Sequence, residues 1–176
     1  MSEVRIEVEA LARRAKEASR ALAVVSSERK DAVLRRVAAS LRAPASDSVL
    51  RANEEDIAHG SDLTSALIDR LRLDRARLDG VADALDSIVE LPDPVGQVVS
   101  SRRLANGLVV SRVRAPLGLI GIIYESRPNV TVDAAALCFK AGNACLLRGG
   151  REAFRTNRAL AEVFIAALVA EGVESA

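Results

Sequence analysis

Apolar residues recur every three or four positions over most of the first 90 residues, which is the period of an amphipathic helix. Ser26 and Ser27 are candidate caps for a second helix, which should end before Pro44 because the residue before a proline avoids helical geometry. A third helix is predicted for residues 46–57, with His59-Gly60 as its end and the glycine as a left-handed stop. The stripe of the first helix consists of Val4, Val8, Leu11, Ala15, Ala18, Leu22 and Val25.

Two more helices are predicted before the pattern breaks. Residues 63–71 form a short one, and Asp74 caps a longer one that reaches about Val89. The following segment, LPDPVG at residues 91–96, has two prolines and a glycine, which interrupt regular structure. We therefore assign residues 1–91 to a helical N-terminal part.

Residues 97–103 and 108–114 are β-rich runs joined around Asn106-Gly107, which predicts a β-hairpin. A two-stranded hairpin is marginally stable alone because it buries little surface. It is expected to lie against the body of the protein or against another subunit. We assign residues 92–115 to a linker and this arm.

From residue 116 the pattern changes to short, continuously apolar runs. Residues 119–124 and 144–147 predict two buried parallel strands, and residues 130–141 predict the helix between them, which Gly142-Asn143 ends. Strands that are apolar throughout predict helices on both faces of the sheet. A last helix is expected over residues 152–170, and its apolar face includes Phe154, Leu160, Val163, Phe164, Ala167 and Leu168.

The predicted fold class is α/β, with N-terminal helices and a β-hairpin arm packed on a parallel, Rossmann-like βαβ sheet. Residues 116–176 hold only two strands and finish soon after a helix that should lead to a third. A stable sheet needs more strands or a partner. We therefore expect the sheet to be incomplete and the chain to be a fragment.

Composition narrows the classes of partner. The chain has 25 basic and 24 acidic side chains, and its arginines are dispersed, so no nucleic-acid partner is expected. No run approaches the roughly 20 apolar residues that cross a membrane, and the N-terminus has no apolar signal core, which predicts a cytoplasmic protein.

Cys138 and Cys145 lie in apolar segments without an adjacent base, which favours a place in the buried core over a role as nucleophiles. His59 is predicted to be an exposed helix-end residue rather than a base.

Polar residues follow both predicted strands of the βαβ unit, and ligands of open α/β sheets bind outside the carboxyl ends of the strands. The first loop, YESRPN at residues 124–129, has an acid, a hydroxyl, a guanidinium and an amide in one turn. Helix capping leaves Glu125 and Arg127 unexplained, which favours a binding site over a purely structural turn. Capping and complementing the helix dipole account for Asn129, Thr131 and Asp133.

The second loop is Arg148-Gly149-Gly150-Arg151, which opens the last helix. Its glycines allow close approach of a ligand, the helix start supplies N–H donors, and the arginines add positive charge. An anion such as phosphate is therefore expected there, and the alternative is a plain turn with solvated arginines. No G-x-G-x-x-G fingerprint, Walker loop or metal-ligand cluster occurs in the sequence.

The run from Pro116 to Ala153 closely resembles γ-glutamyl phosphate reductase (glutamate-5-semialdehyde dehydrogenase), a branch of the aldehyde dehydrogenase superfamily. YESRPNVTVDA and LRGG carry the resemblance, and LPDPVG and the NGL of the hairpin extend it over essentially the whole chain. It implies NADPH-dependent reduction of L-glutamyl 5-phosphate to glutamate 5-semialdehyde and phosphate, the second step of proline synthesis. It also implies a cysteine thiolate in a catalytic domain that lies downstream of this chain, so no catalytic residue is assigned to Cys138 or Cys145.

The resemblance also suggests roles for single residues. Arg148 falls near the expected adenosine ribose, and Arg151 replaces the acid of NAD-preferring relatives, which favours NADPH over NADH. Ser126 stands where most aldehyde dehydrogenases have an asparagine that holds the oxyanion, and Asn129 is a possible substitute. The predicted cofactor-binding residues are Tyr124, Glu125, Ser126, Arg127, Arg148, Gly149, Gly150 and Arg151, with no metal ligand.

The hairpin at residues 97–114 resembles the superfamily's oligomerisation arm, which implies a homo-oligomer. Two alternatives stay open at this point. One is an acylating aldehyde dehydrogenase that uses coenzyme A, although the wording of residues 124–131 favours the glutamyl phosphate branch. The other is a non-catalytic module that binds a cofactor or takes part in assembly.

Overall fold

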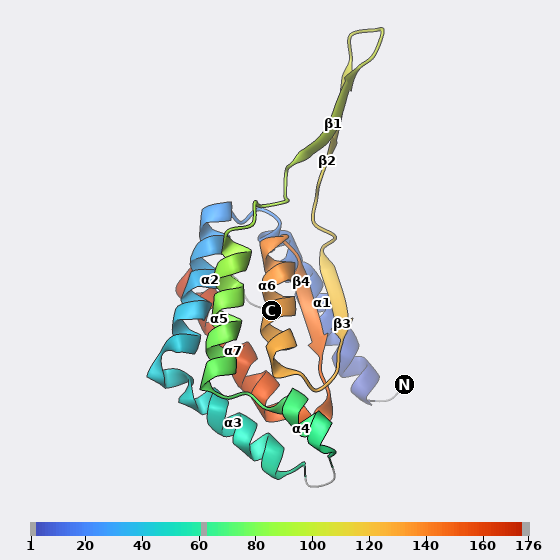
Figure 1. Ribbon diagram of the computed structural model, residues 1–176. Helices are drawn as coiled ribbons and strands as arrows, with labels where there is room; N and C mark the ends of the chain where they lie inside the picture. The colour runs from blue at the N-terminus through green and yellow to red at the C-terminus, as the bar shows by residue number, and fades with distance from the viewer. Residues whose placement is uncertain (1–2, 61–62, 174–176) are drawn as a thin grey trace.

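A computed structural model describes residues 3–60 and 63–173 of the chain, which form a helical body and a protruding hairpin (Figure 1). The elements follow in the order α1 (Glu3–Leu22), α2 (Ser27–Arg42), the 3-10 turn η1 (Pro44–Ser46), α3 (Asp47–Ala58), α4 (Ser65–Leu71), α5 (Arg75–Val89), β1 (Val98–Arg103), β2 (Val109–Val113), β3 (Leu119–Ile123), α6 (Pro128–Lys140), β4 (Ala144–Arg148), the 3-10 turn η2 (Arg151–Ala153) and α7 (Phe154–Ala170).

Local capping sets several helix ends. The side chains of Ser26 and Asp74 accept backbone N–H groups at the starts of α2 and α5, as predicted. Thr64 caps α4 in the same way, so this helix begins at Ser65 rather than at residue 63. The expected left-handed stop at Gly60 is wrong, because this glycine does not have a positive φ. A side chain at Gly60 would instead crowd Leu63, so close approach explains the glycine.

Only the second half of the predicted α1 stripe is buried. Ala15 and Ala18 are almost fully covered, whereas 55% of Val8 and 40% of Leu11 are exposed. The side chain of Val4 lies outside the described residues. The covered half is the part of α1 that packs beside β3 and β4, since a Cβ at Gly118, just before β3, would lie 3.6 Å from the Ser19 hydroxyl. The apolar stripe of α1 is therefore longer than the part of the helix that the rest of the body covers.

The parallel βαβ unit forms as predicted. β3 pairs with β4 from Leu119 opposite Ala144 to Ile123 opposite Arg148, and α6 connects them. α6 and α1 both pack on this sheet, and Figure 1 shows the strands between them. The strands are only half buried, and 79% of Ile123 is exposed, because within the described residues this sheet has just these two strands. The expectation of two fully buried strands was wrong, and the expectation of an incomplete sheet is confirmed.

One core joins the N-terminal helices to the βαβ unit. Phe139 on α6 and Phe164 on α7 meet edge to face, with ring centroids 6.0 Å apart. Phe154, which was assigned to the apolar face of the last helix, is 63% exposed because it begins α7 at the edge of the body. The fully buried side chains include Leu34, Leu41, Leu78, Leu85, Val132 and Leu160.

β1 and β2 form the predicted antiparallel hairpin, whose turn uses Gly107 at a φ of 85°. Every residue of both strands is exposed, and Figure 1 shows the hairpin projecting away from the body. The expectation that this arm packs on the sheet was therefore wrong. Of the two surfaces considered for it, the body of the protein is excluded.

Candidate functional site

The two loops that follow β3 and β4 meet at the carboxyl end of the sheet. The Tyr124 N–H donates to the carbonyl of Arg148 over 3.1 Å, which extends the strand pairing by one step. The Ser126 hydroxyl then donates to a carboxylate oxygen of Glu152, 2.6 Å away. This hydrogen bond lowers the pKa of Glu152, so the carboxylate stays ionised. The two predicted loops are therefore one connected structure.

The glycines of the second loop make room for protein side chains. A Cβ at Gly150 would overlap the hydroxyl of Ser126, and one at Gly149 would overlap the amide of Asn157 and crowd the Tyr124 ring. Neither glycine has a positive φ. Close contact between the two loops therefore explains why both residues are glycines. The sequence analysis had instead explained them by close approach of a ligand.

Tyr124 has a structural role in this contact. Thr131 donates its only hydroxyl proton to the Asn157 side-chain oxygen over 2.9 Å, so the Tyr124 hydroxyl must donate to Thr131, 2.7 Å away. Burial raises the pKa of Tyr124, which keeps the phenol protonated. The chain Tyr124–Thr131–Asn157 ties β3, α6 and α7 together next to the loops.

Glu125 and Arg127 stay at the surface. The Glu125 carboxylate lies 3.3 Å from a guanidinium nitrogen of Arg70 and 3.4 Å from one of Arg127, and all three side chains are about half exposed or more. Exposed pairs of this kind contribute little to stability, about 0–1 kcal/mol. The structure therefore leaves these charges accessible to a ligand.

The predicted cap of α6 by Asn129 or Thr131 was wrong. Arg127 holds the N-cap position, and no side chain among the described residues caps this helix. Asn129 is exposed and donates to Asp133 over 3.2 Å, and Asp133 stands in the second turn of the helix rather than the first. The first N–H groups of α6 consequently face the loop without a side-chain acceptor.

The start of α7, by contrast, is already capped from another helix. Asp56 on α3 is 3% exposed and accepts the backbone N–H of Thr156 over 2.8 Å, the Thr156 hydroxyl over 2.7 Å and the N–H of Arg155 over 3.3 Å. The N–H donors of Arg155 and Thr156 are therefore already used, and the anion site expected at residues 148–151 stays a prediction. The sequence held a signal for the capping role of Asp56, because Asn53 and Asp56 follow Val49 at helical spacing on the buried face of α3.

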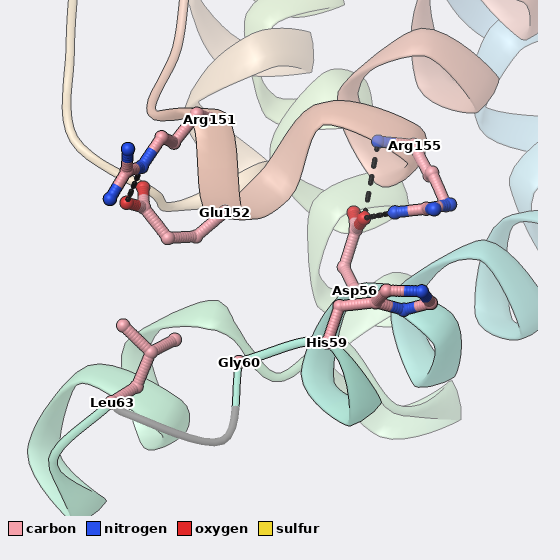
Figure 2. Close-up of a pocket in the computed structure, with 7 residues that line it drawn as sticks. All are labelled: Asp56, His59, Gly60, Leu63, Arg151, Glu152 and Arg155. Carbon is pink, nitrogen blue, oxygen red and sulfur yellow. Dashed lines mark hydrogen bonds and ion pairs between the residues drawn. The ribbon is translucent and has the colours of Figure 1, made fainter.

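A pocket of about 330 Å³ lies between the end of α3 and the second loop (Figure 2). Arg151, Glu152 and Arg155 line one side of it, and Asp56, His59, Gly60 and Leu63 line the other.

The charges of this pocket differ in availability. Arg155 lies between Glu55 and Asp56, and Arg151 pairs with Glu152 at 3.2 Å but keeps 95% of its side chain exposed. His59 is an exposed helix-end residue, as predicted, with Nδ1 2.7 Å from the carbonyl of Glu55. Sequence reasoning did not foresee that it lines a pocket opposite Arg151, because the two residues are remote in the chain.

A second hollow, of about 510 Å³, lies between α4, α5 and the start of α6, and we call it the arginine groove. Asn129 also lines it, next to the first loop. Its charged lining residues are Asp69, Arg70, Arg72, Arg77, Arg127 and Asp133.

The two cysteines belong to the packed interior, as predicted. Cys138 is buried and Cys145 is half buried. The neighbouring Cys138 thiol and burial raise the pKa of Cys145 and keep its thiol protonated. Within the described part of the chain, no group of three or more side chains is placed to hold a metal ion. No helix in that part is long and apolar enough to span a membrane.

Comparison with known proteins identifies close relatives over nearly the whole chain. No family model matches it. The γ-glutamyl phosphate reductase of Novosphingobium aromaticivorans is 52% identical over 168 residues, which are 94% of this chain and 39% of that protein. The enzyme of the same name from Sorangium cellulosum is 52% identical over 93% of this chain and 40% of its own length. The chain therefore spans about 40% of the length of the curated relatives it matches.

Solved structures agree with these relatives. The crystal structure of γ-glutamyl phosphate reductase from Thermotoga maritima superposes with a TM-score of 0.88 at 37% identity, covering 92% of this chain and 39% of that one. An acetylating aldehyde dehydrogenase from Geobacillus thermoglucosidasius, at 17% identity and a TM-score of 0.67, covers 96% of this chain and 35% of that one, and shows the shared fold alone. The body thus has the aldehyde dehydrogenase-like fold, and nearly the whole chain is similar to the N-terminal portion of γ-glutamyl phosphate reductases.

Proposed function

We propose that this chain is the N-terminal part of the cofactor domain of an enzyme that reduces L-glutamyl 5-phosphate to L-glutamate 5-semialdehyde and phosphate with NADPH. The observation that carries the proposal is the 52% identity to γ-glutamyl phosphate reductase over 94% of the chain. The reaction belongs to proline synthesis, and the enzyme is proposed to act in the cytoplasm, where free thiols such as Cys138 and Cys145 persist.

The loops at the sheet end are suited to hold a dinucleotide. Arg148 and Arg151 are both exposed, and Arg151 keeps guanidinium donors beyond the one paired with Glu152. These two side chains would bind phosphate groups at the adenosine end, next to the pocket of Figure 2. The nicotinamide supplies hydride when it is bound. Gly149, Gly150, Tyr124 and Ser126 support the site by packing the loops together.

The residues of the first loop, near the proposed site of reaction, differ in the roles they can take. Ser126 already donates its hydroxyl proton to Glu152, so it is poorly placed to hold an oxyanion. Asn129 is exposed and uses one amide proton on Asp133, which leaves a second donor for that role. Glu125 and Arg127 flank it at the surface. The thiolate that attacks the acyl phosphate is proposed to lie in the part of the relatives outside this chain, so the chain alone is expected to be inactive.

The two alternatives are less well supported. An acylating enzyme that uses coenzyme A would match the Geobacillus neighbour, but at 17% identity this likeness shows fold alone. A non-catalytic module would not by itself account for the 52% identity to an enzyme family. We therefore retain the reductase as the proposed function.

Arg151 provides the test of the cofactor assignment. The chain is expected to bind NADPH more tightly than NADH by about tenfold, because a guanidinium contact to the 2′-phosphate is worth roughly 1.5 kcal/mol. Arg151→Glu should reverse this preference by repelling the phosphate. Titrations that follow nicotinamide fluorescence measure both affinities.

The matched control is Arg158→Glu, which makes the same charge change on an exposed part of α7 outside the pocket. It should leave the NADPH to NADH ratio unchanged. An unchanged ratio in Arg151→Glu would remove Arg151 from the 2′-phosphate site. A folded chain that binds neither nucleotide would refute cofactor binding by this part of the protein.

A further inference from the structure

The arginine groove has an excess of positive charge, since four arginines and two aspartates line it. Arg77 is held in place by the Asp69 carboxylate at 2.7 Å and by the Arg72 carbonyl at 2.9 Å. Arg72 is exposed, and no hydrogen bond or ion pair of its side chain is found among the described residues. The groove is therefore suited to an anionic group, and guanidinium forks fit carboxylate geometry well.

Asp133 adds a carboxylate to the same groove. Its Oδ2 accepts the amide of Asn129, but its Oδ1 is shielded from solvent and has no hydrogen-bond partner among the described residues. Burial raises the pKa of Asp133, against the smaller effect of Asn129. A buried carboxylate oxygen without a donor is unfavourable, and such a group calls for an explanation, of which a bound ion or a catalytic role is one.

The two features come from different elements around the groove. Arg72 and Arg77 come from the start of α5 and the residues before it, whereas Asn129 and Asp133 lie on α6. A ligand that satisfies both must carry a cation and an anion. An α-amino acid has this arrangement, with an ammonium and a carboxylate on one carbon.

We propose that the arginine groove binds the α-amino-acid end of the substrate, with Asp133 facing the ammonium and Arg72 and Arg77 facing the carboxylate. This rests on the proposed function in one respect, because a glutamyl substrate held here extends its side chain toward Asn129 and the first loop. The groove is separate from the pocket beside Arg151, so amino-acid binding does not require a bound nucleotide.

Calorimetric titration of the intact chain with three small probes tests the assignment. L-glutamate carries both groups, glutarate lacks the ammonium, and 4-aminobutanoate lacks the α-carboxylate. L-glutamate is expected to bind at least about tenfold more tightly than either, since each missing charge-assisted contact is worth about 1.5 kcal/mol or more. Equal affinities for L-glutamate and glutarate would show a plain anion site and overturn the proposal, as would the absence of L-glutamate binding by a folded chain.

Variants assign the two halves of the site. Asp133→Asn should reduce the advantage of L-glutamate over glutarate to about twofold or less, whereas Glu54→Gln, an exposed change on α3, should preserve it. Arg72→Gln should weaken L-glutamate and glutarate by a similar factor, and Arg35→Gln on the exposed side of α2 should weaken neither. Arg72 is exposed, so this variant tests the proposal even where Asp133→Asn disturbs folding. An Arg72→Gln chain with unchanged affinities would overturn the assignment of the carboxylate.

The NADPH titration separates this proposal from the proposed function. L-glutamate binding with no nucleotide binding would support the groove and count against the cofactor assignment. A folded chain that binds NADPH but does not discriminate L-glutamate from glutarate would support the cofactor assignment and overturn the amino-acid site in the groove. Circular dichroism of each variant confirms that the comparison is made between folded proteins.

Discussion

At the scale of single residues, most polar side chains at the sheet end are engaged with one another. Ser126 holds Glu152, and Tyr124 reaches Asn157 through Thr131. These contacts fix the shapes of the two loops. The exposed side chains around them include Arg148, Arg151 and Asn129, which we propose recognise the ligand. A residue type that suggests binding can thus serve to position its neighbours.

Gly150 shows how closely this loop contact is packed. Gly150→Ala would place a methyl group against Ser126 and Glu152, so we expect the free energy of unfolding to fall by about 1–3 kcal/mol. Gly80→Ala on α5 is the matched control, because nothing lies within 4 Å of the added Cβ. The control should raise stability by up to about 1 kcal/mol through helix propensity. Urea unfolding followed by circular dichroism measures both, and a Gly150→Ala chain as stable as the parent would contradict the packing argument.

At the scale of elements, two buried lysines join segments that are far apart in the chain. Lys30 on α2 is 1% exposed and donates to Asp93, which precedes the hairpin, over 2.8 Å. Lys140 on α6 donates to Asp31 on α2 over 2.5 Å and to the carbonyl of Val89 on α5 over 3.0 Å. Neighbouring residues of α2 thereby anchor both the linker before the hairpin and the crossover helix of the sheet.

Asp93 gives a prediction that depends on pH. Burial opposes its ionisation, but hydrogen bonds from Lys30, the Val95 N–H and Ser27 outweigh burial and lower the pKa of Asp93. Because the folded-state pKa lies below the ordinary value, the stabilisation is present above about pH 4 and is lost as pH falls through the folded-state pKa. Asp93→Asn should therefore lower the free energy of unfolding by about 3–5 kcal/mol at pH 7, because it leaves a buried lysine unpaired.

Denaturant unfolding at a series of pH values checks this expectation. The difference between the parent chain and Asp93→Asn should shrink below about pH 4, as the parent carboxylate becomes protonated. Asp83→Asn is the control, because Asp83 pairs with Arg42 at the surface and is 74% exposed, so its loss should cost less than about 1 kcal/mol. A difference that stays constant through acid pH would show that the charge of Asp93 is not the stabilising element.

The elements that sequence patterns predicted correctly are those whose causes are local. The caps at Ser26 and Asp74 lie within three residues of the N–H groups they satisfy, and the hairpin turn is set by Gly107 itself. What the patterns did not predict has remote causes. Asp56 caps a helix about 100 residues later, and the second loop packs on Ser126 through a contact 26 residues away. The candidate loops were located by sequence, but which of their side chains are already engaged depended on tertiary packing.

At the scale of the whole molecule, the hairpin leaves a large apolar area uncovered. Between 41% and 59% of each of six valine and leucine side chains is exposed along its strands and turn, namely Val98, Val99, Leu108, Val109, Val110 and Val113. Both outer edges of the two-stranded sheet also lack a partner strand among the described residues. Exposed apolar strands with open edges are typical of surfaces that pair with another chain. The hairpin is thus suited to assembly rather than to the stability of its own body.

We therefore expect the chain to self-associate through residues 97–114. Replacing residues 98–113 with a short glycine-serine linker should convert an oligomer to a monomer in light scattering coupled to size exclusion. The body should keep its melting temperature at matched low concentration, because the hairpin does not pack on it.

Val110→Lys is a milder variant that should weaken association, and Arg103→Lys, which keeps the charge, is its control. The first half of α1 offers a second exposed apolar surface through Ile6, Val8 and Leu11, so an oligomer that survives removal of the hairpin would place the interface there instead.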